Sequence, residues 1–247
     1  MEIFSKNGLW GAFVAVHVIV AVMWMGLLWF FNFVQTPAYA EMDAAARNNA
    51  FDKLTWRALW WFRWAAAATV TFGILIIAVE GSDLYNSDFW KSTAGVTLLL
   101  GIIMALVMLY NVWMIIWPNQ QIVIANARKV QGGGEADPNA PAAARAGAMA
   151  SRQNTIFSLP VLFFMVGVGH FYAESHFDSA PSSGIWFVYL LLGIIVIGVL
   201  EANALGKISG RGNTGLNVIY ETHINALYTG IGLILGFYIL AEILLRR

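Results

Sequence analysis

Long apolar segments alternate with short polar ones along the chain, and this spacing predicts a bundle of membrane-spanning helices. Between Leu9 and Val34 the chain contains no Lys, Arg, Asp or Glu, and a helix needs about 20 mainly apolar residues to cross a bilayer. Ala38-Tyr39-Ala40 resembles a signal-peptide cleavage site, but the apolar run before it exceeds the usual core of about 7–15 residues. We therefore expect a retained span. The six predicted spans are 9–34, 58–79, 94–117, 155–173, 184–205 and 218–245.

The segments between these spans differ in character. Residues 41–57 place apolar side chains at helical spacing among charges, which predicts a helix lying on the membrane surface. Residues 131–148 are rich in Gly, Pro and Ala, so we expect a flexible linker. Pro160 predicts a kink in the fourth span. The pattern as a whole predicts an all-α, polytopic membrane protein whose single domain is one bundle of six helices over residues 1–247.

Composition supports this class and limits the chemistry. The chain is 59% hydrophobic and 11% charged, whereas soluble domains carry about 25% charged residues. The formal net charge is zero, so nothing indicates nucleic acid as a partner. The chain contains no cysteine, which excludes disulfides, iron–sulfur clusters and covalently attached c-type haem.

Basic residues in the short loops predict the orientation, because cytoplasmic loops carry an excess of Lys and Arg. Ten basic residues lie in or beside the first, third and fifth loops, and four lie on the opposite side. The ten are Arg47, Lys53, Arg57, Arg63, Arg128, Lys129, Arg145, Arg152, Lys207 and Arg211, and the four are Lys6, Lys91, Arg246 and Arg247. We therefore expect both termini on the periplasmic side of a bacterial inner membrane.

Two histidines fall inside apolar segments, at similar predicted depth. His17 lies in the first span, and His170 lies near the outer end of the fourth, beside Gly167 and Gly169. A neutral imidazole in a membrane needs a hydrogen-bond partner, a metal or a function. One interpretation is that both are axial ligands of the iron of a b-type haem. The alternative is that both form hydrogen bonds inside the bundle. His176, in the next loop, is either a solvated residue or a replacement for His170.

The opposite, inner side collects polar side chains from several spans. They are Asn32, Gln35, Arg63, Glu221 and His223. We expect Asn32, Gln35 and Arg63 to bind a substrate, and Glu221 or His223 to act catalytically by removing a proton. Arg63 has two further interpretations: its side chain extends to the lipid headgroups, or it pairs with Glu221.

Three weaker features have simpler interpretations. Asn111 and Glu201 lie near predicted span ends, which indicates an interfacial position rather than a catalytic one. Gly232-x-x-x-Gly236 is expected to mark a helix contact.

Three stretches together resemble the membrane domain of bacterial cytochrome-c-linked urate hydroxylases, the family described as urate oxidase, N-terminal. They are WMGLLWFFNFVQTP (24–37), ALWWFRWAAAATVTFG (58–73) and LPVLFFMVGVGHF (159–171). The resemblance extends over the chain in the number and order of spans. It implies oxidation of urate toward 5-hydroxyisourate at the inner membrane, a step of purine degradation, with electrons passed to a c-type cytochrome. Typical members carry that cytochrome c domain fused at the C-terminus. Because this chain ends at Arg247 without a cysteine, we expect a separate cytochrome as acceptor.

The combined hypothesis is a membrane-embedded haem b redox protein with a substrate pocket on the cytoplasmic side. Electrons would leave through the haem to a periplasmic or membrane-bound c-type cytochrome. Two alternatives remain open. The protein could be a haem electron-transfer subunit without its own substrate, or a cofactor-free accessory subunit of a larger respiratory or photosynthetic complex.

Overall fold

A computed structural model describes residues 5–79, 83–85, 87–167 and 184–245 of the chain, and the described part contains helices but no strand. The first three long helices each consist of three segments in direct succession. The first runs from Lys6 to Glu41 through α1 (Lys6–Trp29), the π-helical η2 (Phe30–Gln35) and α2 (Thr36–Glu41). The second runs from Ala44 to Ala78 through α3 (Ala44–Ala50), the π-helical η3 (Phe51–Thr55) and α4 (Trp56–Ala78).

The remaining elements follow the same helical scheme. After the short 3-10 helices η4 (Asp83–Tyr85) and η5 (Phe89–Lys91), the third long helix comprises α5 (Thr93–Tyr110), the π-helical η6 (Asn111–Ile116) and α6 (Trp117–Gln131). Then come α7 (Ala140–Gly167), α8 (Ile185–Ala204), the 3-10 helix η7 (Gly215–Tyr220) and α9 (His223–Leu245). Helix α7 continues through Pro160 without an interruption.

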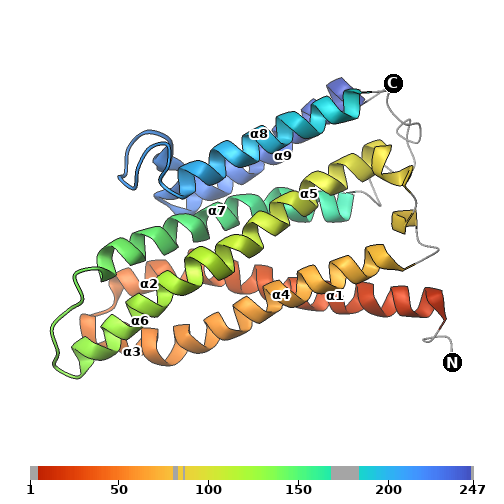
Figure 1. Ribbon diagram of the computed structural model, residues 1–247. Helices are drawn as coiled ribbons and strands as arrows, with labels where there is room; N and C mark the ends of the chain where they lie inside the picture. The colour runs from red at the N-terminus through yellow and green to blue at the C-terminus, as the bar shows by residue number, and fades with distance from the viewer. Residues whose placement is uncertain (1–4, 80–82, 86, 168–183, 246–247) are drawn as a thin grey trace.

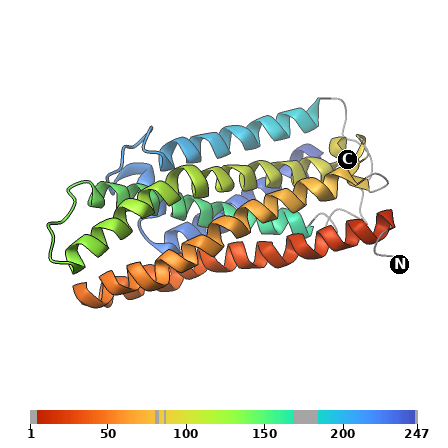
Figure 2. The ribbon, with the colours of Figure 1, turned by 60° about the horizontal axis from the view of Figure 1, so that its bottom comes forward.

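The helices form three layers, which Figures 1 and 2 show from two sides. Helix α1 packs along α4 in one outer layer, and α8 packs against α9 in the other. Between them lie α5, α6 and α7, so that α7 contacts helices of both outer layers. Helix α1 begins and α9 ends at the same end of the bundle (Figure 1). The loop 132–139 and the loop between α8 and α9 lie at the opposite end.

Among the described residues, five helices are long and apolar enough to cross a membrane, which supports the predicted polytopic class. They are Lys6–Glu41, Ala44–Ala78, Thr93–Gln131, Ile185–Ala204 and His223–Leu245. Their outward residues are apolar, for example Val22, Ile195 and Ile243, and such faces suit lipid contact. Helix α7 is not among the five. It carries the first part of the predicted fourth span, 155–173, but residues beyond 167 lie outside the described part.

Two expectations about the connecting segments and one about a helix contact were wrong. Residues 44–55 do not form a separate surface helix; they continue α4 as one helix from Ala44. The linker is shorter than predicted, because α7 already begins at Ala140. The helix contact expected at Gly232 and Gly236 is not made within the described chain, since a Cβ at either glycine would meet no atom within 4 Å. The close contact lies at Gly230, where a Cβ would come within 2.8 Å of the Ile156 carbonyl oxygen.

The long helices extend well beyond a bilayer. At 1.5 Å per residue, 36 residues span about 54 Å, whereas the hydrocarbon core is about 30 Å thick. The polar segments α3 and α6 lie at the end opposite the two chain termini (Figure 1), so we infer that the excess length projects into water there. A polar helical extension is stable there because a helix satisfies its own backbone hydrogen bonds in water as well as in lipid.

Candidate functional site

A cavity of about 100 Å³ lies among the first three long helices and α7, at the level of their π-helical segments. Segment η2 contributes Phe31, Asn32 and Gln35, η3 contributes Thr55, and η6 contributes Ile116. The other lining residues are Thr36, Leu59, Phe62, Gln120, Gly147, Ala148, Ser151 and Arg152. A π-helical turn inserts an extra residue into a helix and re-aims its side chains, and such turns are frequent at functional sites. Three of them around one cavity therefore mark it as the candidate site.

The predicted residues Asn32 and Gln35 both line this cavity, but their side chains are already engaged. Asn32 Nδ2 donates to Ser151 Oγ at 2.9 Å and to the Leu28 carbonyl oxygen at 2.9 Å. Gln35 Oε1 accepts from the Thr55 hydroxyl at 3.3 Å, and that hydroxyl also bonds Tyr39 at 2.7 Å. These bonds fix the orientation of both amides, while Asn32 Oδ1 and Gln35 Nε2 form no hydrogen bond with a described residue.

Two other lining residues, Gln120 and Arg152, have polar atoms without a partner. Arg152 is only 7% exposed, and its Nη1 is buried without a hydrogen-bond partner. Gln120 Oε1 is buried and equally unpartnered. Sequence reasoning missed both, because Arg152 was counted as a loop cation and Gln120 follows the third predicted span. A signal was available: Ser151, Arg152, Asn154, Thr155 and Ser158 form a polar run entering an apolar helix.

Arg63 takes a different position from the one predicted for a substrate ligand. Its guanidinium lies over the Trp117 ring, at 3.6 Å from the centroid, and near Trp113, at 5.1 Å. Arg63 is not among the residues that line the cavity. Such cation–π contacts stabilise a cation beside aromatic faces. The ion pair of Arg63 with Glu221, which was one of the alternative interpretations, is not formed.

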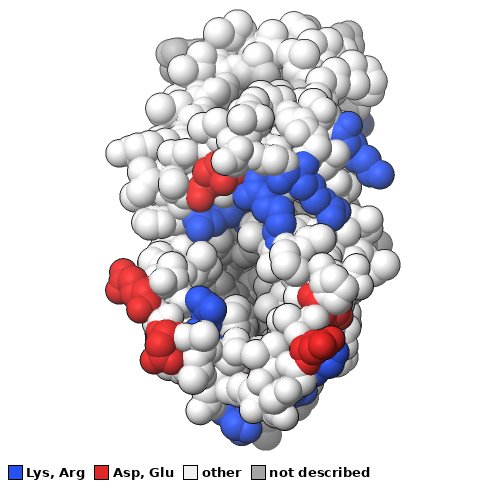
Figure 3. Space-filling model, turned by 90° about the vertical axis from the view of Figure 1, so that its left-hand side faces the viewer, with Lys and Arg blue, Asp and Glu red and all other residues white. Residues whose placement is uncertain are grey.

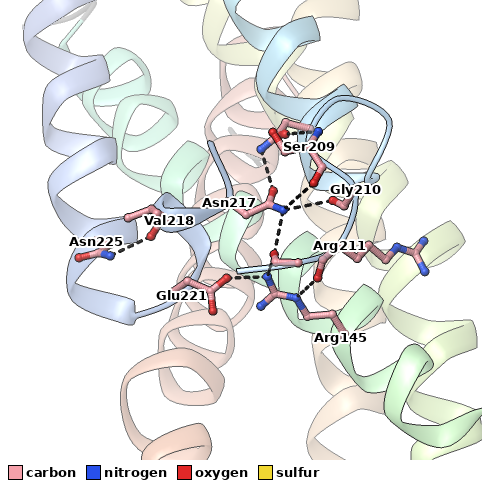
Figure 4. A network of polar contacts seen from close by, with 10 residues as sticks. Arg145, Ser209, Gly210, Arg211, Asn217, Val218, Glu221 and Asn225 are labelled. Carbon is pink, nitrogen blue, oxygen red and sulfur yellow. Dashed lines mark hydrogen bonds and ion pairs between the residues drawn. The ribbon is translucent and has the colours of Figure 1, made fainter. Parts of the chain in front are cut away.

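Glu221 instead pairs with Arg145 of α7, whose Nη2 lies 2.5 Å from Glu221 Oε1 (Figure 4). Arg145 also donates to the carbonyl oxygens of Arg211, at 2.9 Å, and Gly212, at 2.7 Å. Asn217 stabilises the same loop by donating a hydrogen bond to the Gly212 carbonyl oxygen at 2.9 Å. This network attaches the loop between α8 and α9 to α7.

Figure 3 shows a central hollow at this end of the molecule, with Lys and Arg side chains along its upper edge and both Asp or Glu and further basic side chains beside it. Arg152 is close enough to Glu221 to interact with its charge, but within the described residues it forms no ion pair. His223 begins α9 and lies against Phe33 of η2, with ring centroids 5.9 Å apart. Glu221 and His223 are thus near the cavity without lining it.

Towards the other end of the bundle, His17 of α1 contacts α4. Its Nδ1 lies 2.8 Å from the Thr69 carbonyl oxygen, so in the Nδ1–H tautomer it donates to that carbonyl. Gly73 leaves room for the ring, since a Cβ there would come within 3.2 Å of His17 Cε1. Nε2 forms no hydrogen bond with any described residue. A ring held in this way by a carbonyl is the arrangement found in metal-ligating histidines, and it also serves as a plain interhelical bond.

The second predicted haem ligand cannot be placed, because His170, like His176, lies outside the described residues. Among the residues that are described, no group of three or more His, Asp or Glu side chains could hold a metal ion. Of the two predicted haem ligands, only His17 lies within the described residues.

The sequence indicated an interfacial position for Asn111 and Glu201. Asn111 is instead buried in the bundle, whereas Glu201 lies three residues before the end of α8. Asn111 is fully buried, and its Nδ2 donates to Asn154 Oδ1 at 3.0 Å and to Glu201 Oε2 at 2.9 Å. Asn154 Nδ2 in turn donates to the Met108 carbonyl oxygen at 2.9 Å. This polar network joins α5, α7 and α8 in the centre of the bundle.

Tyr220 continues the polar contacts toward the loop end. Its hydroxyl donates to Gln153 Oε1 at 2.8 Å and lies 2.9 Å from the Leu200 carbonyl oxygen. Burial raises the pKa of the Tyr220 phenol, which keeps it a neutral donor.

The comparisons with known proteins give one match. The family model described as urate oxidase N-terminal matches residues 70–208, more than half of the chain, and this confirms the resemblance noted from the sequence. The matched segment contains Gln120 and Arg152, begins after His17 and ends before Glu221. No curated protein and no solved structure gives a match.

Proposed function

Because the chain belongs to the urate oxidase N-terminal family, we propose that it is a membrane-bound oxidoreductase that oxidises urate and passes the electrons to a c-type cytochrome. The cavity at the loop end is the proposed substrate site and faces the cytoplasm of a bacterium. The end at which α1 begins and α9 ends faces the periplasm, where the acceptor binds. The basic side chains around the cavity end (Figure 3) support this orientation, since cytoplasmic segments carry the excess of Lys and Arg.

A b-type haem is the proposed electron carrier, with His17 as one ligand. The observation that carries this proposal is the hydrogen bond from Nδ1 of His17 to the Thr69 carbonyl oxygen, which orients the ring and leaves Nε2 free to bind iron. His170 is proposed as the second ligand on the sequence argument alone. When bound, a haem accepts and releases single electrons within the membrane.

The chemistry requires the protein to accept protons. Urate and one water yield 5-hydroxyisourate, two electrons and two protons, so a base must reach the ring directly or through one water. Of the two predicted candidates, Glu221 is held by Arg145 at 2.5 Å. His223 has no such partner among the described residues and is packed beside Phe33, one residue from Asn32. We therefore assign proton removal to His223.

The electrons must then cover about 22 Å along α1, because Asn32 follows His17 by fifteen residues. Trp24 lies between them, two turns from His17 on the same face, and is fully buried with an unpartnered Nε1. An aromatic ring in this interval shortens the distance that any single transfer must bridge.

Spectroscopy of the purified protein tests the proposal. The dithionite-reduced minus oxidised spectrum should show the bands of a b-type haem. These bands should be lost or shifted in His17→Ala and unchanged in the matched control His223→Ala. Absence of the bands, or identical bands in both variants, contradicts the haem assignment. If dithionite produces these bands and urate does not, the result favours an electron-transfer subunit without its own substrate.

A further inference from the structure

We propose that Arg152 and Gln120 together bind the ligand of the cavity, and that this ligand is a small planar heterocyclic anion carrying an oxo group beside an N–H. Urate has this chemistry, so the identity of the ligand rests on the proposed function. The two residues and the kind of ligand they select are inferred from the geometry of the cavity.

The first argument is the charge of Arg152. The residue is 7% exposed and lines the cavity, yet in the described part of the chain no carboxylate pairs with it. The nearby Glu221 is committed to Arg145, which holds it at 2.5 Å. A buried guanidinium without a counter-ion is unfavourable, and such a charge in a membrane protein usually has a functional partner. An anion in the cavity would supply the missing charge.

The second argument is that one buried donor and one buried acceptor in the cavity wall both lack a hydrogen-bond partner. Buried polar atoms are normally satisfied, and each exception needs an explanation. Asn32, Gln35, Thr55 and Ser151 bond one another or the backbone. Only Arg152 Nη1 and Gln120 Oε1, among the described lining atoms, are buried and unpartnered.

A ligand that satisfies both atoms must offer an oxygen acceptor to the guanidinium and an N–H donor to the amide oxygen. Fully deprotonated anions such as sulfate and carboxylates provide the acceptor but no donor. A heterocycle with neighbouring oxo and N–H groups provides both. The site therefore selects oxopurine-type anions over sulfate, because sulfate carries no hydrogen to donate and leaves Gln120 Oε1 unsatisfied.

The shape of the cavity agrees with a flat and small occupant. Phe31 and Phe62 meet edge to face, with centroids 5.4 Å apart, and Leu59 and Ile116 complete the apolar wall. The volume of about 100 Å³ is below the roughly 300–1,000 Å³ of pockets for drug-sized ligands. We therefore expect a single heterocycle to enter and a nucleoside to be excluded.

Calorimetric titration of the full chain in detergent tests the inference. The probes are urate, inorganic sulfate, which is an anion without a hydrogen-bond donor, and caffeine, which is planar but has neither the anionic charge nor an N–H. Urate should bind, and the other two should not compete with it. Urate affinity should fall at least tenfold in Arg152→Gln and in Gln120→Ala, and more in Gln120→Glu, whose carboxylate repels the anion. The exposed Arg57→Gln is the matched control and should bind like the wild type.

The outcomes separate this inference from the proposed function. If urate binds with the expected dependence on Arg152 but never reduces a haem, the site assignment stands and the oxidase proposal fails. If urate reduces the haem equally well in Arg152→Gln, the oxidase proposal stands and the site assignment fails. No urate binding to the wild type, or equal affinities in all variants with unchanged helical content, also overturns the inference.

Discussion

Glu221 lies 2.5 Å from Arg145, and this ion pair connects the loop before α9 to α7. The pairing has two consequences. The ion pair anchors the loop between α8 and α9 at the cavity end. Because Glu221 is bound to Arg145, its carboxylate does not act as the counter-ion of the nearby Arg152.

Replacing Glu221 by Gln should therefore have a small effect on stability and a favourable one on binding. Arg145 keeps its bonds to two loop carbonyls, so we expect a loss of about 1 kcal/mol, measured by tryptophan fluorescence during thermal unfolding. Urate affinity should rise about two- to threefold, because a negative charge near Arg152 is removed. The exposed Asp88→Asn should change neither quantity. A fall in turnover of about a hundredfold would instead identify Glu221 as the base.

Gly73 is predicted to be necessary for the position of His17. A Cβ at this residue would lie 3.2 Å from His17 Cε1, so Gly73→Ala should displace the ring and weaken its bond to the Thr69 carbonyl. The absorbance of bound haem per protein should fall. Gly11→Ala on the same helix as His17 is the control, since a Cβ there meets nothing within 4 Å. Equal haem content in the two variants would contradict the role of Gly73.

Gly230 should be the glycine on which the contact of α9 with α7 depends. A Cβ would approach the Ile156 carbonyl oxygen to 2.8 Å, so Gly230→Ala should destabilise the bundle by about 1–3 kcal/mol. Gly232→Ala meets no atom and should be neutral or slightly stabilising, because alanine favours helix. Thermal unfolding in detergent distinguishes them, and equal losses in both variants would refute this packing.

The buried Asn111 should contribute to stability through its two acceptors. Asn111→Ala leaves Asn154 Oδ1 and Glu201 Oε2 without their donor, and each buried unsatisfied group costs about 1–3 kcal/mol. The control is Asn119→Ala, whose side chain bonds only the Ile115 carbonyl of its own helix. The same unfolding assay should show a clearly larger loss for Asn111. A loss no larger than that of the control would mean that the network is not stabilising.

Hydropathy predicted a span well where the apolar segment and the helix end at the same residues. The predicted span 184–205 corresponds to α8 at Ile185–Ala204, and 58–79 ends with α4 at Ala78. It failed where a helix continues into a polar environment, as in residues 44–55. Backbone hydrogen bonds maintain a helix in either solvent, whereas hydropathy reports only the preferred solvent of the side chains.

The candidate site was predicted only in part. Asn32 and Gln35 could be found because amides stand out at the end of an apolar span. Arg152 was missed, because a charged residue just before a predicted span is normally assigned to water, although the polar run from Ser151 to Ser158 was a signal in the sequence. The long-range packing of α6 and α7 buries it, and such packing has no signature in local composition. The partner of Glu221 was missed for the same reason.

Anaerobic addition of urate to the oxidised, purified protein tests the central claim most directly. The account predicts that the visible bands of a reduced b-type haem appear with urate, at a rate that Arg152→Gln lowers at limiting urate concentrations. It also predicts that a c-type cytochrome, added afterwards, removes them. An unchanged spectrum after urate, in a preparation that dithionite reduces fully, would contradict it.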